Sequence, residues 1–413
     1  MSTDQRTTPA KFQIRSLTWS VYAPSFLLTF GQGLLIPILP IFARDVFGSS
    51  DVLIAFMITA RPLGTMLFDV PAGVLVGMLG LRRTMMAGIL LFAIGAIIGG
   101  LSPNFSILMM GRLFAGSSFA LWSISRQVYI AQTVPVANRG RALSLFGGIS
   151  RVATIIGPVA GGLLYDHVDV RAPFFAQAVV ALITGGLVMA TFRGTLESAV
   201  NVGKHNVFPD LGHTIMDHKH VFATAGVAAI MLQFLRAARE YIIPLWADEL
   251  GLSGSQSGFI FGVSSVIDSV MFPIVGFVMD RWGRKYVGVP AYLILACGFA
   301  IIPLANTYAL LMLVGVLVGL GNGLSSGLVL TMGVDFAPRK NPGEFMGVWR
   351  LISDIGGASG PSAIGSYAAV VTLGTASVLT AGIGVLGAGI LLFLVKETLV
   401  KDNGPLDTSP SKG

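Results

Sequence analysis

The chain has 413 residues, of which 54% are hydrophobic and only 11% are charged, and its mean hydropathy is +0.78. A soluble domain of this size does not have such a composition, so we predict a polytopic membrane protein. The net charge of +7 would suit a nucleic-acid-binding protein. The basic residues, however, gather in loops beside apolar segments, so no nucleic-acid partner is expected.

The apolar segments predict an all-α protein with twelve membrane-spanning helices of about 20 residues each. We expect them at residues 17–43, 50–77, 83–101, 106–133, 142–165, 172–192, 221–247, 256–279, 286–305, 308–335, 344–370 and 374–395. Residues 194–219 form the longest polar stretch and are interpreted as a linker. The chain then divides into a first six-helix bundle (1–193), the linker (194–219), a second six-helix bundle (220–397) and a Pro- and Ser-containing tail (398–413) that is expected to be disordered.

The two halves repeat each other. A shift of 203 residues, without a gap, places Gly on Gly seven times between residues 73 and 162, where chance would give only ~1–2 matches. The same shift places Pro158 on Pro361. Membrane chains built from two such halves carry their substrate site between the halves, so the repeat predicts a transporter with two pseudo-symmetric bundles.

The orientation follows from Lys and Arg. Outside the expected spans, eighteen basic residues fall on the side that holds both termini and the linker, and only Arg44 and Arg171 fall on the other side. This bias predicts that both termini are cytoplasmic. The expected spans place the protein in a lipid bilayer. The expected location is the plasma membrane or the bacterial inner membrane.

A charged motif lies between the eighth and ninth spans. It reads G-F-V-M-D-R-W-G-R-K from Gly276 to Lys285 and includes Asp280 and Arg281. It resembles the loop signature of the major facilitator superfamily, G-x-x-x-D-R-x-G-R-K. The copy in the first half has Gly77 in place of the acid, and Asp69, two helical turns earlier, is a candidate substitute.

Further motifs extend this resemblance over essentially the whole chain. The fourth span contains G-R-L-F-A-G from Gly111 with the intramembrane Arg112, and the fifth contains G-P-V-A-G-G from Gly157. The latter is similar to the antiporter motif of exporters in this superfamily. The resemblance implies two bundles that alternate access to a central site, and it is strongest to the twelve-span proton-coupled drug exporters. In that fold the fifth span lies against the eighth, and the second against the eleventh.

Charged residues inside the spans are candidates for function, because a charge near the bilayer centre costs ~3 kcal/mol or more. The eleven are Arg61, Asp69, Arg112, Arg126, Arg151, Arg236, Arg239, Glu240, Asp268, Arg350 and Asp354. The superfamily arrangement brings Arg151 toward Asp268 and Arg61 toward Asp354, so we expect two gating ion pairs, one at each bundle interface. Arg112, Asp280 and Arg281 are further gating candidates. A static pair that only fixes the register of the bundles is the alternative.

We expect proton coupling at Asp268 and Asp354 first, and at Glu240 and Asp69 next. Arginines outnumber acids seven to four within the spans, which would favour an anionic or zwitterionic substrate. By resemblance, the first, fourth, seventh and tenth spans line the substrate cavity. The candidates are Tyr22, Phe26, Phe30, Gln32, Phe119, Trp122, Gln233, Phe234, Arg236 and Tyr241. Aromatic and amide side chains suit an amphipathic small molecule.

Three functions remain open from the sequence. Proton-coupled export of a small organic compound leads, and proton-coupled uptake of an organic anion follows. The alternative from another class is a non-transporting receptor or scaffold. No nucleophile–base set, phosphate-binding loop or metal spacing is present, so neither enzyme activity nor a cofactor is expected. The single Cys297 excludes an intrachain disulfide, four of the five histidines lie in or beside the linker, and a monomer is expected.

Overall fold

The computed structural model describes residues 17–191, 212, 214–338 and 342–398, and these residues form helices and short connections without a β-strand. The first bundle begins with a short π-helical segment, Thr18–Tyr22. It continues with α1 (Ala23–Leu35), α2 (Leu39–Phe47), α3 (Asp51–Leu79), α4 (Leu81–Leu101), α5 (Phe105–Thr133), α6 (Val136–His167) and α7 (Ala172–Thr191). The expected linker lies largely outside the described residues, as does the tail from residue 399.

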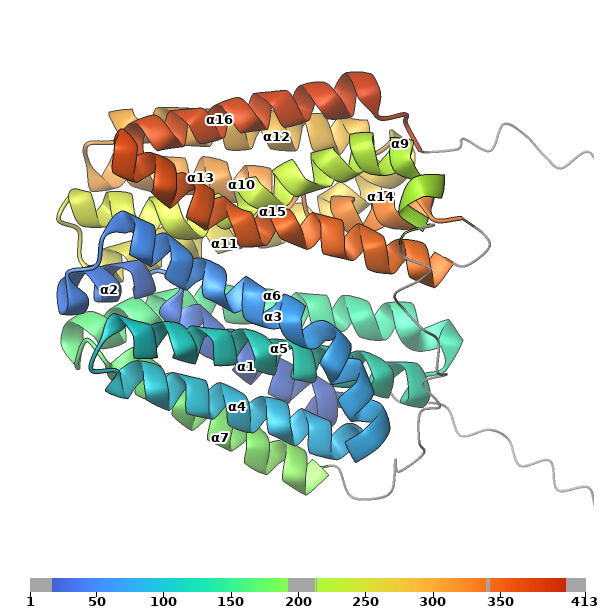
Figure 1. The fold of residues 1–413 in the computed structure, drawn as a ribbon, viewed down its shortest axis with the longest axis horizontal. Helices are drawn as coiled ribbons and strands as arrows, with labels where there is room; N and C mark the ends of the chain where they lie inside the picture. Colours follow the sequence, from blue (N-terminus) through green and yellow to red (C-terminus); the bar gives the residue numbers. More distant parts are fainter. Residues whose placement is uncertain (1–16, 192–211, 213, 339–341, 399–413) are drawn as a thin grey trace, which may run out of the picture.

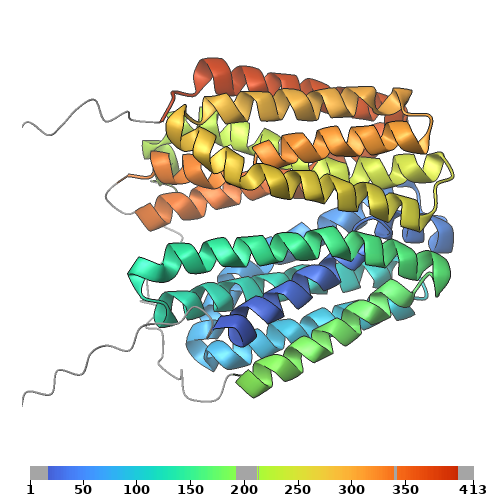
Figure 2. The same ribbon diagram turned by 180° about the vertical axis from the view of Figure 1, so that it is seen from behind.

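The second bundle repeats this plan and lies beside the first (Figures 1 and 2). It comprises α9 (Lys219–Val221) with the π-helical segment Phe222–Gly226, α10 (Val227–Glu249), α11 (Gly254–Arg281), α12 (Lys285–Ile301), α13 (Tyr308–Leu324), α14 (Leu328–Phe336), α15 (Pro342–Val370) and α16 (Leu373–Gly389). The last helix continues as the π-helical segment Ile390–Leu394. The expected all-α fold with two bundles is confirmed.

Among the described residues, ten helices are long and apolar enough to cross a membrane, and a bent pair makes up to eleven. The bent pair is the first expected span, which turns by 43° between α1 and α2. The eleventh expected span is the 29-residue helix α15, which is not in this set. Its segment A-S-G-P-S-A-I-G-S from Ala358 is rich in small polar residues, and α15 packs against α3 and α10 inside the protein.

The sequence repeat has a local structural basis at the helix starts. Ser50 and Ser253, which are 203 residues apart, precede α3 and α11, and Asn104 and Thr307, also 203 apart, precede α5 and α13. The side chains of Ser253, Asn104 and Thr307 accept a hydrogen bond from a backbone N–H in the first helical turn. Such N-caps fix where a helix begins, so the two halves start these helices in the same register.

Glycines fix two turns in each half. Gly48 and Gly251 have φ values of 59° and 67°, and Gly80 and Gly283 have values of 80° and 115°. Each pair is again 203 residues apart. Side chains rarely adopt positive φ, so glycine is the residue that these turns require.

The bundles meet along two interfaces, α6 against α11 and α3 against α15, as the family resemblance predicted. At one end of the molecule, here called the sealed end, the contacts are tight. Arg44 on α2 pairs with Asp248 on α10 (Nη1–Oδ2 2.6 Å), and the Asp166 carboxylate on α6 accepts the backbone N–H groups of Gly254 and Ser255 on α11. A Cβ added at Gly162 would overlap the carbonyl oxygen of Gly254.

The other end is here called the linker end, because α7 ends there and α9 starts there (Figure 1). The first described helical segment also starts at this end, and the last one ends there. Toward this end the interface helices separate. A Cβ added at Gly147 or Gly148 on α6, at Gly276 on α11 or at Gly357 on α15 would have no neighbouring atom within 4 Å. The bundles are closed at the sealed end and spread at the linker end.

Gly161 in α6 should be indispensable for the packing of the first bundle, because an added Cβ would overlap the backbone of Leu34 on α1. We expect Gly161→Val to lower the free energy of unfolding by about 1–3 kcal/mol, measured by thermal unfolding of the purified protein. The matched control is Gly186→Val on α7, where a Cβ has no neighbour within 4 Å. Equal stability of the two variants would contradict the packing.

Candidate functional site

A polar cavity of ≈ 370 Å³ lies between the two bundles. The first bundle contributes Arg61, Pro62 and Thr154, and the second contributes Gln233, Arg236, Ala237, Arg239, Glu240, Ser265, Asp268, Asn322 and Gly357. Five of these side chains are charged. Because both bundles form its wall, any movement of one bundle against the other changes the shape of this cavity.

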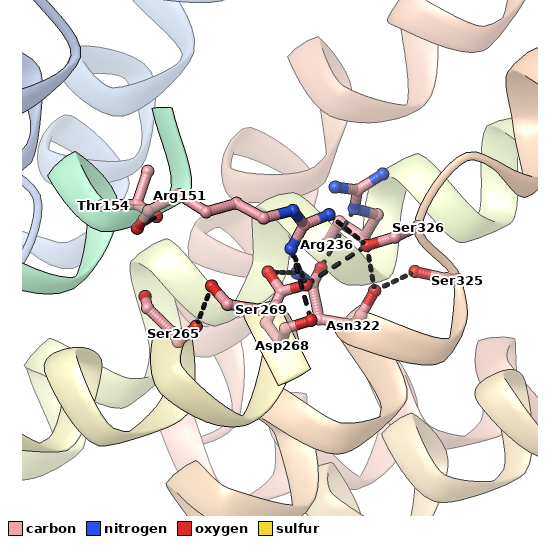
Figure 3. A network of polar contacts seen from close by, with 9 residues as sticks. All are labelled: Arg151, Thr154, Arg236, Ser265, Asp268, Ser269, Asn322, Ser325 and Ser326. Carbon is pink, nitrogen blue, oxygen red and sulfur yellow. Dashed lines mark hydrogen bonds and ion pairs between the residues drawn. The ribbon is translucent and has the colours of Figure 1, made fainter. Parts of the chain in front are cut away.

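Arg151 joins the bundles at the edge of the cavity, as the sequence predicted. Its Nη1 lies 2.9 Å from Oδ1 of Asp268 and 3.2 Å from the Asp268 carbonyl oxygen. Figure 3 shows the side chain of Arg151 reaching from α6 to Asp268 on α11. The guanidinium also lies over the ring of Phe272, 4.2 Å from its centre. The two charged side chains are only 21% and 17% exposed, so the pair is largely removed from solvent.

Two side chains of α13 and the segment that follows it complete this network. Asn322 donates its Nδ2 hydrogen to Oδ2 of Asp268 (2.7 Å), and the Ser326 hydroxyl donates to Oδ1 (3.1 Å). Asn322 accepts from Nε of Arg236 through its own oxygen (3.0 Å), which links Arg236 to the same carboxylate (Figure 3). The sequence analysis missed Asn322 and Ser326. The available signal was a cluster of polar residues in an otherwise apolar span.

The second interface carries a different ion pair from the expected one. Arg61 does not pair with Asp354: its Nη2 donates to Oε1 of Gln32 (2.8 Å) and its guanidinium lies over the ring of Phe119. Arg350 contacts Asp354 instead, one helical turn away on α15 (3.7 Å), and reaches Asp69 on α3 of the other bundle (3.5 Å). The prediction failed because an arginine on the same helix lies closer to Asp354 than one on the facing helix.

Arg61 and Arg112 instead line a small pocket that adjoins the cavity. Gln32 and Glu240 line the same pocket. Glu240 therefore faces both spaces, and within the described part of the chain it forms no ion pair within 4 Å. Arg61, Arg112 and Glu240 thus form a second charged group beside the Arg151–Asp268 pair.

The expected cavity residues divide among several places. Gln233 and Arg236 line the central cavity, whereas Gln32, Phe119 and Trp122 line a small pocket within the first bundle. Phe234 is half-buried against an apolar core that includes residues of both bundles.

Four of the expected cavity residues lie elsewhere. Tyr22 and Phe26 line an apolar pocket of ≈ 630 Å³ formed by α1, α6, α7 and the segment before α1, and Phe30 stacks on Phe26. Tyr241 was also misplaced. It is fully buried and donates its hydroxyl to the Asp51 carbonyl at the sealed end, because α10 turns this face toward α3 and not toward the cavity.

The charged loop motif acts through residues other than the two singled out. Asp280 and Arg281 are exposed, and Arg281 only lies over the ring of Phe277. Arg284 forms the ion pair, with Nε 2.7 Å from Oδ2 of Asp335 on α14. Glu397 accepts the backbone N–H groups of Arg284 and Lys285 at the start of α12. The motif therefore fastens helices within the second bundle.

Metal binding receives no support from the described residues, which contain no group of three or more His, Cys, Asp or Glu side chains arranged to hold an ion. Of the linker histidines, His205 and His213 lie outside the described residues, and the His218 ring packs edge-on against Phe345.

Comparison with known proteins identifies the class. The family model described as "Major Facilitator Superfamily" matches residues 23–361 and 225–410, so the chain belongs to this superfamily of membrane transporters. Multidrug resistance protein 2 of Bacillus subtilis (strain 168) is 25% identical over 268 residues, which are 63% of this chain and 66% of that protein. Quinolone resistance protein NorA of Staphylococcus aureus (strain COL) is 24% identical over 387 residues, covering 91% and 95%.

The fold agrees with solved transporters. A POT family transporter in complex with a thioalcohol-conjugated peptide has a TM-score of 0.77 at 11% identity, covering 92% of this chain and 95% of that one. At this identity the match speaks to the fold alone. The described helices and the family together define a multi-pass integral membrane transporter.

The Arg151–Asp268 pair should be energetically coupled. We expect Arg151→Gln and Asp268→Asn each to destabilise the protein by about 1–3 kcal/mol, because each leaves a largely buried charge without its partner. The loss of stability in the double variant should be smaller than the sum of the losses in the two single variants. The difference, which is the coupling energy, should be about 0.5–3 kcal/mol. A double-mutant cycle on thermal unfolding measures this, and strictly additive losses would contradict the pairing.

Proposed function

We propose that this chain is a proton-coupled exporter of a small amphipathic organic compound. The observation that carries the proposal is the Arg151–Asp268 pair, which connects the two bundles beside a polar cavity that both bundles line. The names of two relatives, a multidrug resistance protein and a quinolone resistance protein, support export and a drug-like organic substrate.

The proposed coupling follows from the electrostatics of this pair. When the bundles rock apart along α6 and α11, Asp268 loses its direct ion pair with the Arg151 guanidinium. A carboxylate left uncompensated in a cavity of low dielectric is expensive to keep ionised, and taking up a proton removes that cost. The two conformations then bind protons differently, which is what a proton gradient needs in order to bias them.

Arg350 offers a parallel device at the second interface. It lies between Asp69 of the first bundle and Asp354 of the second. At the first interface, the first bundle supplies the arginine and the second bundle the acid. At this interface, the second bundle supplies Arg350 and the first bundle supplies Asp69. Asp354 and Asp69 are therefore the next proton-binding candidates. Glu240 is the last candidate, and it lines the cavity without an ion pair in the described structure.

Uptake of an organic anion is the second candidate, favoured by the number of arginines around the cavity. The direction of flux separates the two. In proteoliposomes with an imposed pH gradient, a proton-coupled exporter moves substrate in the direction opposite to the proton flow. A symporter moves substrate and protons in the same direction. A panel of organic cations, zwitterions and anions measured in both gradient directions makes this test.

Neutralising the first pair should uncouple transport. We expect Asp268→Asn/Arg151→Gln to abolish pH-driven accumulation while substrate exchange without a gradient stays measurable, because the cavity persists but the proton-binding difference is lost. Asp69→Asn/Arg350→Gln is the matched variant at the other interface. If both double variants accumulate substrate normally against a gradient, the pairs are structural and the proton site lies at Glu240 or Asp354.

The linker end is proposed to be cytoplasmic, on the basis of the Lys and Arg bias. Ser2 near the N-terminus, Asn201 in the linker and Ser411 near the C-terminus serve as reporter positions, and all three lie outside the described residues. In a Cys297→Ala background, cysteines at these positions should resist an impermeant thiol reagent in intact cells, whereas Val168→Cys in the loop after α6, where Val168 is 70% exposed, should react. Reversed labelling would contradict the orientation.

A further inference from the structure

The central cavity and its adjoining pocket carry more positive than negative charge. Their lining residues include Arg61, Arg112, Arg236 and Arg239 against Glu240 and Asp268. Asp268 is already engaged by Arg151. Within the described structure, none of the four lining arginines has a carboxylate within 4 Å. Asp268 also attracts Arg236 and Arg239 at longer range, yet the four lining arginines still outnumber the two lining acids, Asp268 and Glu240.

Some of the N–H groups of these arginines also lack a hydrogen-bond acceptor within the described structure. Nη1 of Arg239, Nε of Arg61 and Nε of Arg112 are buried and have no hydrogen-bond partner among the residues that the structure describes. Arg236 donates to the neutral oxygens of Asn322 and Gln233, which satisfy its hydrogen bonds but do not cancel its charge. Buried ionised donors without acceptors are unfavourable, so this arrangement is prepared for an acceptor that the protein itself does not supply.

The arginines approach the cavity from both bundles. Arg61 comes from α3 of the first bundle. Arg236 and Arg239, three residues apart and so on one face of a helix, come from α10 of the second. Phe261 lies beneath Arg239, with the guanidinium carbon 5.8 Å from the ring centre. An anion between these side chains would contact both bundles at once.

We infer that the cavity contains an anion subsite, in which Arg61 on one side and Arg236 with Arg239 on the other bind a carboxylate of the transported compound. The inference rests on the proposed transport function and specifies its substrate as an amphipathic acid or zwitterion. Arginine suits this task, because its planar guanidinium donates two parallel hydrogen bonds to a carboxylate. The occupied subsite draws the two bundles together, since it replaces a repulsion between their arginines by a shared attraction.

Matched fluorescent probes test this with purified full-length protein in lipid nanodiscs. Dansylglycine carries the carboxylate, its methyl ester lacks the charge, and dansylethylenediamine carries a cation. We expect the acid to bind about tenfold more tightly than the ester, and the amine most weakly. Equal affinity for acid and ester, including binding of neither, would overturn the inference.

Arginine variants identify the subsite. Arg239→Gln and Arg61→Gln should each weaken dansylglycine binding about tenfold while leaving the ester unchanged or stronger. The control is Arg82→Gln at the linker end, which removes an exposed guanidinium that donates to the Met189 carbonyl. Loss of acid and ester binding to the same extent would overturn the inference, because it would indicate disturbed packing.

The melting temperature supplies a readout that does not depend on the fluorescence of the probe. Saturating dansylglycine should raise the melting temperature of the wild type more than that of Arg239→Gln, because the variant lacks one guanidinium group of the subsite. Equal stabilisation of both proteins by the acid would contradict the subsite. Selective acid binding without any pH-driven flux would instead retain the subsite and refute the proposed export.

Discussion

A charged side chain inside a membrane protein needs a partner of opposite charge. In this chain, such partners lie across the two interfaces between the bundles. Arg151 of the first bundle finds Asp268 of the second, and Arg350 of the second finds Asp69 of the first. Each contact crosses an interface between the two bundles. The bundles therefore cannot separate there without exposing a charge. In the proposed function, this requirement ties the movement of the helices to protons and to substrate charge.

Glycine packing sets where the movement can occur. Between the sealed end and the Arg151–Asp268 pair, α6 and α11 approach closely at Gly162 and Gly258, where an added Cβ would overlap the facing backbone. Beyond the pair, toward the linker end, Gly148 and Gly276 face open space. The ion pair thus lies at the boundary between the packed and separated halves of the interface.

The sequence predicted the fold, the repeat, the facing helices and the Arg151–Asp268 pair, because apolar length, glycine register and family resemblance all act over whole helices. It did not predict which face of each helix points inward. Tyr241 and Tyr22 were therefore placed in the cavity wrongly. Arg350 was named as a candidate but its contact with Asp354 was not predicted, although a spacing of four residues places both on one helix face. Asp335 and Glu397, which hold Arg284 and its neighbour, come from distant segments that no local pattern connects to it.

The central claim is that the bundles rock about the sealed interface under control of the Arg151–Asp268 pair. Spin labels in a Cys297→Ala background measure it by electron–electron resonance, with one pair at Leu145 on α6 and Phe277 on α11, both exposed toward the linker end, and one pair at Val168 and Gly251 at the sealed end. Between neutral and acidic pH, the two distances should change in opposite directions, and Asp268→Asn should suppress this response. Distances that stay fixed, or that change together, would contradict the account.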